Sequence, residues 1–411
     1  MRKNKFLTIL IFLGCCLLVT GCFKSKNNVT NEITNKVTNE ITQKTTIYDI
    51  TDNINTLEDA VKTCVKAVES SVIGITLKVK TTSKINGEKV SFEDTESIGS
   101  GVIYKRVENK TGDKITSYTY YAYTNAHVVT SEEEGDYVTY AYLGEYETEI
   151  PLTILGYDQK IDLACVKFDS YYYIEPVKIG NSKDLSKGNF VIAIGSPDGY
   201  DYYGSATFGI VSNLGRYISF DTDNDGTNDY VGEYIQTDAA INPGNSGGGL
   251  FTIDGKLIGI NSIKLTSVKI DNMGFALPIN LVKIAVEDYL EQGKTIVRPR
   301  LGVTCVAVKN INSTFMIQHN LTSLPNIYFD ETPYGVYVEN ISSGGSLSNC
   351  GISKGDIILT FDGNKLYDNS DISGRLNALD QYTIGSKVEI TYYSSKSEKI
   401  ETVTITLKSG E

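Results

Sequence analysis

The chain has 411 residues, of which 41% are apolar and 21% charged, a balance that suits a folded protein of two or three domains. Its net charge of −12 argues against binding to nucleic acid and against electrostatic attachment to anionic lipid. The 37 glycines against 8 prolines favour a turn-rich, mostly β protein.

The first 22 residues have the form of a secretion signal. A basic start is followed by an apolar stretch over 6–19 that is too short to span a bilayer. The stretch ends in Val-Thr-Gly-Cys at 19–22, which resembles the lipobox of bacterial lipoproteins. That resemblance implies cleavage before Cys22, a lipid on its thiol and an extracytoplasmic protein anchored to a bacterial membrane. An ordinary signal peptide with a chance cysteine is the alternative.

Residues 23–55 are rich in Asn, Thr and Lys and have few groups to bury, so we expect a disordered tether. Apolar residues then recur at helical spacing between Leu57 and Val68. A second helix is predicted over Leu281–Gln292, with Asn280 as its N-cap and Gly293 at its end. Between the helices, short apolar runs separated by turn residues predict the strands of a barrel or sandwich, at 72–79, 101–104, 120–124, 148–155, 164–168, 190–194, 207–211 and 257–262.

Four cysteines remain after the signal segment and Cys22 are set aside: Cys64, Cys165, Cys305 and Cys350. Four cysteines allow three pairings, and the sequence does not choose among them. A structural zinc site is not expected, because no Cys-x-x-Cys occurs and the chain has 2 histidines.

The run Asp-Ala-Ala-Ile-Asn-Pro-Gly-Asn-Ser-Gly-Gly-Gly-Leu at 238–250 surrounds Ser246 with glycines. A serine hydroxyl needs a base to become a nucleophile. His319 lies in a polar stretch without obvious partners, so His127, which follows a strand-like run, is the candidate base. A carboxylate must orient such a histidine, and Asp162 stands just before an apolar strand. We therefore predict a catalytic triad of His127, Asp162 and Ser246.

The order His, Asp, Ser on a β-rich chain is that of chymotrypsin-like proteases. Further motifs are Gly-Ser-Gly-Val-Ile at 99–103, Thr-Asn-Ala-His-Val-Val at 124–129, Asp-Leu-Ala-Cys-Val-Lys at 162–167, Ala-Ile-Gly-Ser-Pro at 193–197, residues 235–248 and Gly-Phe-Ala-Leu-Pro at 274–278. With these motifs, the chain over residues 56–293 resembles the HtrA/Deg serine proteases. The resemblance implies a trypsin-like domain of two six-stranded β-barrels with the site in the cleft between them, and a homotrimer.

Attack on a peptide carbonyl places negative charge on its oxygen, which backbone N–H groups can stabilise. We expect the N–H groups of Gly244 and Ser246, together with Asn245, to face that oxygen. Asn245 has no charge with which to bind a freed N-terminus, so activation is expected from loop rearrangement, as the resemblance also implies.

The specificity pocket is expected to be small and aliphatic. The position of trypsin's specificity aspartate is Ala240 here, and Asp238 lies two residues too early. The family pattern suggests Ile241, Ile263 and Leu265 as the lining residues. Lys264 stands where relatives often have an apolar residue, which is a departure from that pattern.

An acidic run at 221–229 spaces its carboxylates like a calcium loop. Asp221, Asp223, Asp225 and Asp229 fit four ligand positions, but position twelve is Gly232 instead of a glutamate. A plain turn is the alternative. Calcium at this loop is a hypothesis, and no other cofactor is expected.

The last module contains Arg-Leu-Gly-Val at 300–303, Gly-Val-Tyr-Val at 335–338 and Gly-Ile-Ser-Lys-Gly-Asp-Ile-Ile-Leu at 351–359. With these segments, residues 298–408 resemble a bacterial PDZ domain. The resemblance implies that Leu301, Gly302 and Val303 offer N–H groups to a peptide's C-terminal carboxylate while the peptide adds as a strand to an exposed edge. Residues 313–332 resemble an insertion near that groove.

The leading interpretation is a serine endopeptidase that hydrolyses unfolded or damaged extracytoplasmic proteins and binds peptide C-termini through its PDZ domain. A surface chaperone or scaffold with little proteolysis is the rival class. A processing protease with one regulated substrate is a third possibility.

Overall fold

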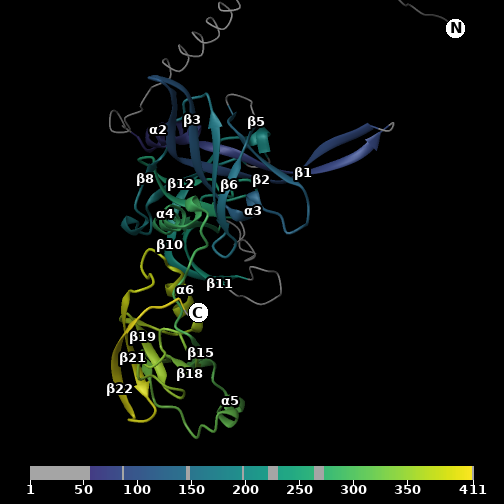
Figure 1. Cartoon of the computed structure of the whole chain (residues 1–411). Coiled ribbons are helices and arrows are strands. Elements are labelled where there is room, and N and C mark those ends of the chain that lie inside the picture. Colours follow the sequence, from purple (N-terminus) through teal and green to yellow (C-terminus); the bar gives the residue numbers. More distant parts are fainter. Residues whose placement is uncertain are drawn as a thin grey trace, which may run out of the picture. The chain divides into compact units, whose positions relative to one another are not determined.

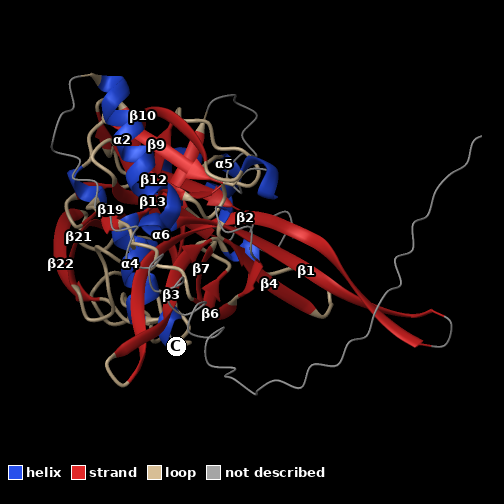
Figure 2. Ribbon diagram, turned by 90° about the horizontal axis from the view of Figure 1, so that it is seen from above, coloured by secondary structure: helices blue, strands red, loops and turns tan. Residues whose placement is uncertain are grey.

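The computed structural model describes residues 56–85, 88–144, 149–196, 199–220, 230–262 and 273–409. The predicted signal, Cys22 and the tether lie outside these residues, as do Asp221, Asp223, Asp225 and Asp229. Strands dominate the described part of the chain, as Figure 2 shows, so the mostly β prediction is confirmed. Among these residues no helix is both long and apolar enough to span a membrane.

Helix α2 (Leu57–Val68) begins the described chain and follows its sequence pattern. The hydroxyl of Thr56 caps it by accepting a hydrogen bond from Asp59 N–H. Ala60, Cys64 and Val68 recur every four residues and form its buried face. The helical prediction for this segment is confirmed.

The first β-sheet has the order β5-β4-β1-β2-β3-β7-β6. Its β1 pairs with β2 from Val72 to Ile85, whereas β4 covers β1 only over Gly74–Val79, so the outer part of the β1–β2 ribbon extends beyond the rest of the sheet (Figure 1). The strands are β1 (Val72–Ile85), β2 (Glu88–Thr111), β3 (Lys114–Thr124), β4 (Tyr137–Tyr142), β5 (Glu149–Pro151), β6 (Thr153–Asp158) and β7 (Leu163–Ser170).

The second sheet closes on itself, because β12 pairs with both β9 and β13. The ring β9-β10-β11-β14-β13-β12 has the six strands that the family resemblance implies, with β8 added in parallel to β13; the first sheet has seven described strands instead. The bounds are β8 (Lys178–Ile179), β9 (Phe190–Gly195), β10 (Ser205–Phe220), β11 (Tyr230–Thr237), β12 (Gly249–Thr252), β13 (Lys256–Ser262) and β14 (Gly274–Pro278).

Helix α4 (Ile279–Asp288) starts two residues earlier than predicted, and a 3-10 turn over Leu290–Gln292 extends it. The N-cap position is Pro278, so the prediction of Asn280 as the cap is wrong. The Asn280 side chain instead accepts a hydrogen bond from Ser182 N–H at 3.0 Å, a partner 98 residues away. Gly293 ends the segment with a left-handed φ of 68°, as predicted.

The C-terminal module is a sheet of order β15-β18-β19-β21-β22, with β20 also paired to β19. Strand β15 is an edge strand whose described partner is β18. Helix α6 (Asn369–Asn377) buries Ile372 and Leu376 against one face of this sheet. The strands are β15 (Val303–Ala307), β16 (Tyr328–Phe329), β17 (Thr332–Pro333), β18 (Val336–Ile341), β19 (Ile357–Phe361), β20 (Asn364–Lys365), β21 (Lys387–Ser394) and β22 (Lys399–Thr406).

The insertion at 313–332 packs on the other face of that sheet. Its helix α5 (Ser313–Gln318) contributes Phe315 to a cluster with Tyr337 and Ile357, whereas their strand neighbours Val336 and Ile358 join the cluster of α6. Successive strand residues point to opposite faces. The described part of the insertion therefore packs on the face of the sheet opposite to α6. The PDZ resemblance implies a peptide groove between α6 and β15, so the expectation that the insertion lies near that groove is wrong.

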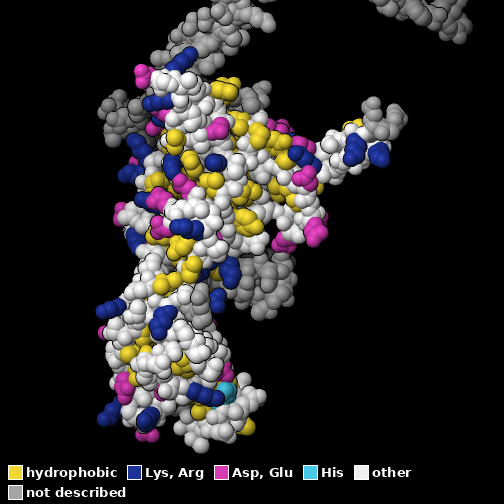
Figure 3. All heavy atoms as spheres, in the orientation of Figure 1, with side chains coloured by type: hydrophobic (Ala, Val, Ile, Leu, Met, Phe, Trp, Pro, Cys, Tyr) yellow, Lys and Arg dark blue, Asp and Glu magenta, His cyan; other side chains and the backbone are white. Residues whose placement is uncertain are grey.

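Charges on the described surface are mixed. On the face shown in Figure 3, basic and acidic side chains are interspersed and form no single field of one sign.

Candidate active site

His127 and Asp162 lie side by side. His127 belongs to the short helix α3 (Ala126–Val129) that follows β3, and Asp162 precedes β7. The imidazole Nδ1 is 2.9 Å from each carboxylate oxygen of Asp162. A carboxylate is only an acceptor, so Nδ1 donates to it, and in a neutral imidazole this arrangement leaves the lone pair on Nε2. The His127 side chain is 30% exposed, which leaves it accessible to a substrate.

The Asp162 carboxylate is buried and has three donors. His127 contributes its backbone N–H at 3.1 Å in addition to its ring, and Ser262 Oγ donates to Oδ2 at 2.9 Å. Asp162 has a left-handed φ of 55°, and Asn125 Nδ2 donates to its carbonyl at 2.7 Å. A buried charge is tolerated when hydrogen bonds satisfy it. The strained backbone is thus held where the carboxylate can orient the imidazole.

Ser246 lies in the loop between β11 and β12 and is buried. Its carbonyl accepts a hydrogen bond from Ser100 N–H at 2.8 Å, which joins the loop to β2 of the first sheet. A Cβ atom at Gly99 would lie 2.5 Å from Val128 Cγ2 and 3.1 Å from the Ser246 carbonyl oxygen. The glycine therefore allows the histidine helix and the serine loop to approach one another.

Backbone hydrogen bonds fix the loop around Ser246. Gly248 N–H donates to the Asn245 carbonyl at 3.0 Å, and Gly247 N–H donates to Asn261 at 2.9 Å. Asn245 N–H donates to the Asn242 carbonyl at 2.9 Å. The Asn245 N–H is thus used within the turn.

The predicted pocket residues are described only in part. Ile241 is buried, and a Cβ atom at Gly274 would lie 2.6 Å from its Cγ1, so it packs tightly beside β14. Asp238 Oδ1 accepts the N–H of Ile210 at 2.7 Å and so binds the backbone of β10. Ile263 and Leu265 lie outside the described residues.

Backbone N–H groups of the 342–347 segment bind the carbonyls of residues 300–302, which lead into the loop at 301–303. The carbonyl of Arg300 accepts Ser346 N–H at 3.1 Å, and that of Gly302 accepts Ser342 N–H at 2.8 Å. The carbonyl of Leu301 is held likewise, by Leu347 N–H at 3.0 Å. In a trans peptide the N–H points opposite to the carbonyl. The N–H groups of Leu301, Gly302 and Val303 therefore face away from the 342–347 segment.

All four cysteines in the described residues are free. Burial raises the pKa of Cys64 and of Cys165 to about 12, and that of Cys305 to about 11. None of the three pairings left open by the sequence is formed. No group of three or more metal-ligating side chains occurs among the described residues, and the acidic run at 221–229 is not among them.

His319 has partners that its sequence context did not reveal. Its ring stacks on Phe315 with centroids 4.1 Å apart, and Nε2 lies 3.2 Å from Glu339 Oε1. These contacts belong to the PDZ module. His319 thus has a structural role on that face of the sheet, which supports the choice of His127 as the base.

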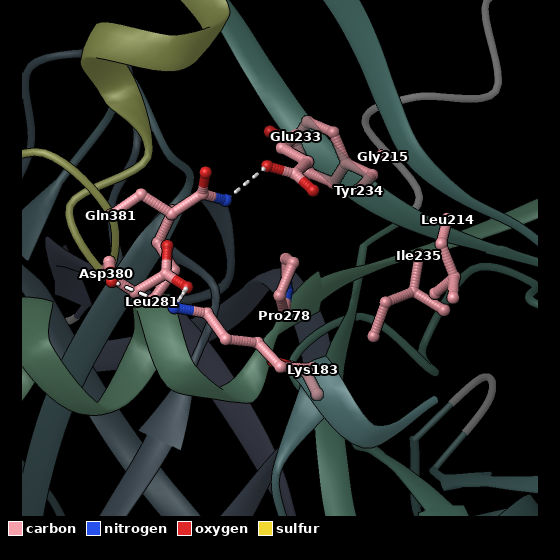
Figure 4. Close-up of a pocket in the computed structure, with 11 residues that line it drawn as sticks. Lys183, Leu214, Gly215, Glu233, Tyr234, Ile235, Pro278, Leu281, Asp380 and Gln381 are labelled. Carbon is pink, nitrogen blue, oxygen red and sulfur yellow. Dashed lines mark hydrogen bonds and ion pairs between the residues drawn. The ribbon is translucent and has the colours of Figure 1, made fainter. Parts of the chain in front are cut away.

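A cavity of about 430 Å³ lies away from the triad. In Figure 4 the Gln381 amide points at the Glu233 carboxylate, and Lys183 reaches Asp380. The two distances are 3.2 and 3.1 Å. Burial raises the pKa of Glu233, with Asp380 as a further cause. The cavity contains none of the predicted catalytic residues, so its size does not identify the active site.

Two serines that support the site could not be identified from the sequence. The sequence pattern places Ser262 at the end of a predicted strand and Ser100 in a motif shared with the family, and it indicates no partner for either. A polar residue at a buried strand position is a weak signal, because its partner cannot be read from the chain.

Known families and proteins match the chain over both modules. The trypsin-like peptidase domain family matches residues 99–260, and the PDZ domain family matches residues 299–407. Serine protease Do-like HtrA of Bacillus subtilis (strain 168) is 33% identical over 348 residues, 84% of this chain and 72% of that protein. The Lactobacillus helveticus protein of the same name is 35% identical over 306 residues, 72% of this chain and 66% of its own length.

Other relatives are longer, and solved structures share the fold. The chain spans 39% of the HtrA-like serine protease of Staphylococcus aureus (strain USA300), at 34% identity. The structure of HtrA-type protease AlgW with decapeptide aligns over 84% of this chain and 97% of its own, with a TM-score of 0.55 and 25% identity. The chain therefore belongs to the HtrA family of serine endopeptidases, with a trypsin-like peptidase domain followed by a PDZ domain.

Proposed function

We propose that this chain cleaves unfolded or damaged proteins by acyl transfer through His127, Asp162 and Ser246. The observation that carries the proposal is the 2.9 Å contact of His127 Nδ1 with both oxygens of a buried carboxylate, next to the loop that holds Ser246. A buried acid, an oriented imidazole and a serine in this order are what such chemistry needs.

In the proposed reaction, Nε2 of His127 takes the proton of Ser246 Oγ as the oxygen attacks the substrate carbonyl carbon. The N–H groups of Gly244 and Ser246 stabilise the oxyanion. The imidazolium, held by Asp162, then protonates the leaving amine, and an acyl-enzyme forms. Water attacks the ester by the same route, with His127 again as base, and releases the second product.

We further propose that the PDZ domain binds the C-terminal carboxylate of peptides. The bound carbonyls at 300–302 support this proposal, because they leave three N–H groups directed the other way. The peptide would then pair with the edge of β15 that β18 does not cover.

The specificity pocket is proposed to accept small aliphatic side chains. Ile241 is apolar, and the Asp238 carboxylate accepts a hydrogen bond from the backbone N–H of Ile210, so neither residue favours a basic substrate side chain. A majority of Lys or Arg before the cut sites in mapped digests would contradict this part of the proposal.

The position of the protein in the cell is a separate proposal. The motif at 19–22 supports a lipid on Cys22 and attachment to a bacterial membrane outside the cytoplasm. The homotrimer rests on family membership, and calcium at 221–229 rests on carboxylate spacing. Sedimentation of the purified protein and cleavage rates with chelator or added calcium test these two points.

The central test compares the wild type with Ser246→Ala on unfolded casein. We expect cleavage by the wild type and none by the variant, while both bind a peptide with a free C-terminal carboxylate and not its amide. A wild type that binds the peptide but leaves casein intact would favour the rival scaffold function.

A further inference from the structure

Ser100, in the middle of β2, is fully buried, and each of its polar groups has a partner. Its N–H donates to the Ser246 carbonyl at 2.8 Å, and its own carbonyl accepts Thr124 Oγ1 at 2.6 Å. Its hydroxyl donates to the Gly244 carbonyl at 2.6 Å and accepts Ser196 N–H at 2.8 Å. One residue of the first sheet thus joins β3, the end of β9 and two points of the Ser246 loop.

The hydroxyl holds one peptide plane of that loop from its carbonyl end. The same plane carries Asn245 N–H, which donates to Asn242 at 2.9 Å, so both ends of the Gly244–Asn245 peptide are fixed. A planar peptide cannot turn at one end alone. Ser100 therefore sets the orientation of the backbone between Gly244 and Ser246.

Gly244 needs such a restraint. Its φ is 93°, and glycine adopts positive and negative φ values about equally, so the residue itself does not fix this conformation. Without the hydroxyl, the Gly244 carbonyl and Ser196 N–H would both be buried without this partner. A turn of the Gly244–Asn245 peptide would then relieve the carbonyl, and it would shift the two adjoining peptide planes, which carry the Gly244 and Ser246 N–H groups.

We propose that Ser100 is a positioning residue of the oxyanion site: its hydroxyl keeps the Gly244 and Ser246 N–H groups aimed at the developing negative charge. This inference rests on the proposed protease function. Ser100 touches neither the substrate nor the reacting atoms and acts only through the backbone of the loop.

The test compares Ser100→Ala with Ser71→Ala. Ser71 is also buried, and its hydroxyl also donates to a backbone carbonyl, that of Glu175 at 2.6 Å, outside the Ser246 loop. Removing an oxyanion donor lowers kcat by about a hundredfold or more, so a misaligned donor is expected to lower it by about ten- to a hundredfold. KM should change by less than about twofold, because the interaction is made in the transition state.

Thermal unfolding is measured for both variants, and inhibition by a peptide boronic acid supplies a second readout. We expect Ser100→Ala to weaken boronate inhibition in proportion to kcat, whereas Ser71→Ala changes neither. Equal kcat values for the two variants would overturn the inference while leaving the protease function intact. A wild type no more active than Ser246→Ala would instead refute the protease function itself.

If Ser100→Ala does not fold, Ser100→Thr and Ser100→Val replace it. The two side chains have nearly the same shape and differ in the hydroxyl. The inference predicts that kcat of the threonine variant exceeds that of the valine variant by about tenfold or more, the lower end of the effect of one misaligned donor. A ratio near one would contradict it.

Discussion

The Ser246 loop and the loop at 301–303 orient backbone N–H groups by the same means but from different supports. In each, a buried serine hydroxyl donates to a loop carbonyl at 2.6 Å and accepts a backbone N–H from a third segment. Ser100 reaches Gly244 across 144 residues, from the first sheet to the second, whereas Ser346 reaches Arg300 across 46 residues within one module.

The difference shows what each loop depends on. The Ser246 loop has all its hydrogen bonds only when the two sheets of the protease domain are packed together, because Ser100 belongs to the first sheet. The loop at 301–303 needs only the folding of its own domain. Changes in the two regions should therefore separate proteolysis from peptide binding.

The largest separation is expected from Asp162→Asn. The amide cannot stabilise the imidazolium and presents an N–H₂ group that favours the wrong tautomer, so kcat should fall by about 10⁴-fold. Hydrolysis of a peptide substrate measures the loss, and fluorescence polarisation of a labelled C-terminal peptide should show unchanged binding. A loss below tenfold would contradict the proposed role of Asp162.

Thiol labelling compares the two domains, because Cys165 is buried in the protease domain and Cys305 is half-buried in the PDZ domain. The thiolate is the reactive form, and a pKa of about 12 for Cys165 leaves a thiolate fraction of about 10⁻⁴ at pH 8, on the order of a thousandfold below an ordinary cysteine. Cys305, at about 11, should have about ten times more thiolate, and both rates should rise with pH while the fold persists. Mass spectrometry after timed iodoacetamide treatment measures this, and rapid labelling of Cys165 before unfolding would contradict it.

Ser346→Ala is the counterpart of Ser100→Ala in the PDZ domain. It leaves the Arg300 carbonyl with one donor fewer and the Lys408 N–H without this acceptor, so peptide affinity should fall by about tenfold. Casein cleavage without added peptide should stay within about twofold. Peptide titrations and casein cleavage rates are measured for Ser346→Ala and Ser100→Ala in parallel. Loss of the same function by both variants would contradict the separate roles of the two serines.

The smallest effect has the opposite sign. Asn369 Nδ2 donates to the Cys305 carbonyl on β15 at 2.7 Å, and so competes for an edge that a peptide strand would use. Asn369→Ala should tighten peptide binding by about three- to tenfold, the value of one hydrogen bond. Asn377→Ala is the control, because this asparagine of the same helix donates elsewhere, to Val231. Weaker binding by the Asn369 variant alone would indicate that the contact supports the groove.

Much of the fold could be predicted because its signals are local. Apolar spacing predicted α2, and short apolar runs between turn residues predicted many strands of the protease domain, since both signals lie within a few residues. The prediction of Asn280 as an N-cap was wrong because its partner is not local. Its side chain accepts a hydrogen bond from Ser182 N–H, 98 residues earlier in the chain.

The sequence by itself determined which reactive groups are present and in what order: a histidine, an aspartate and a glycine-flanked serine, followed by a second module with PDZ motifs. The tertiary structure alone decided which ordinary residues hold these groups in position. Ser100, Ser262 and Ser346 acquire their roles through partners 144, 100 and 46 residues away. Such hydrogen bonds depend on how the sheets pack and how the loops fold back. The residues next to a serine in the sequence do not indicate which distant carbonyl its hydroxyl will bind.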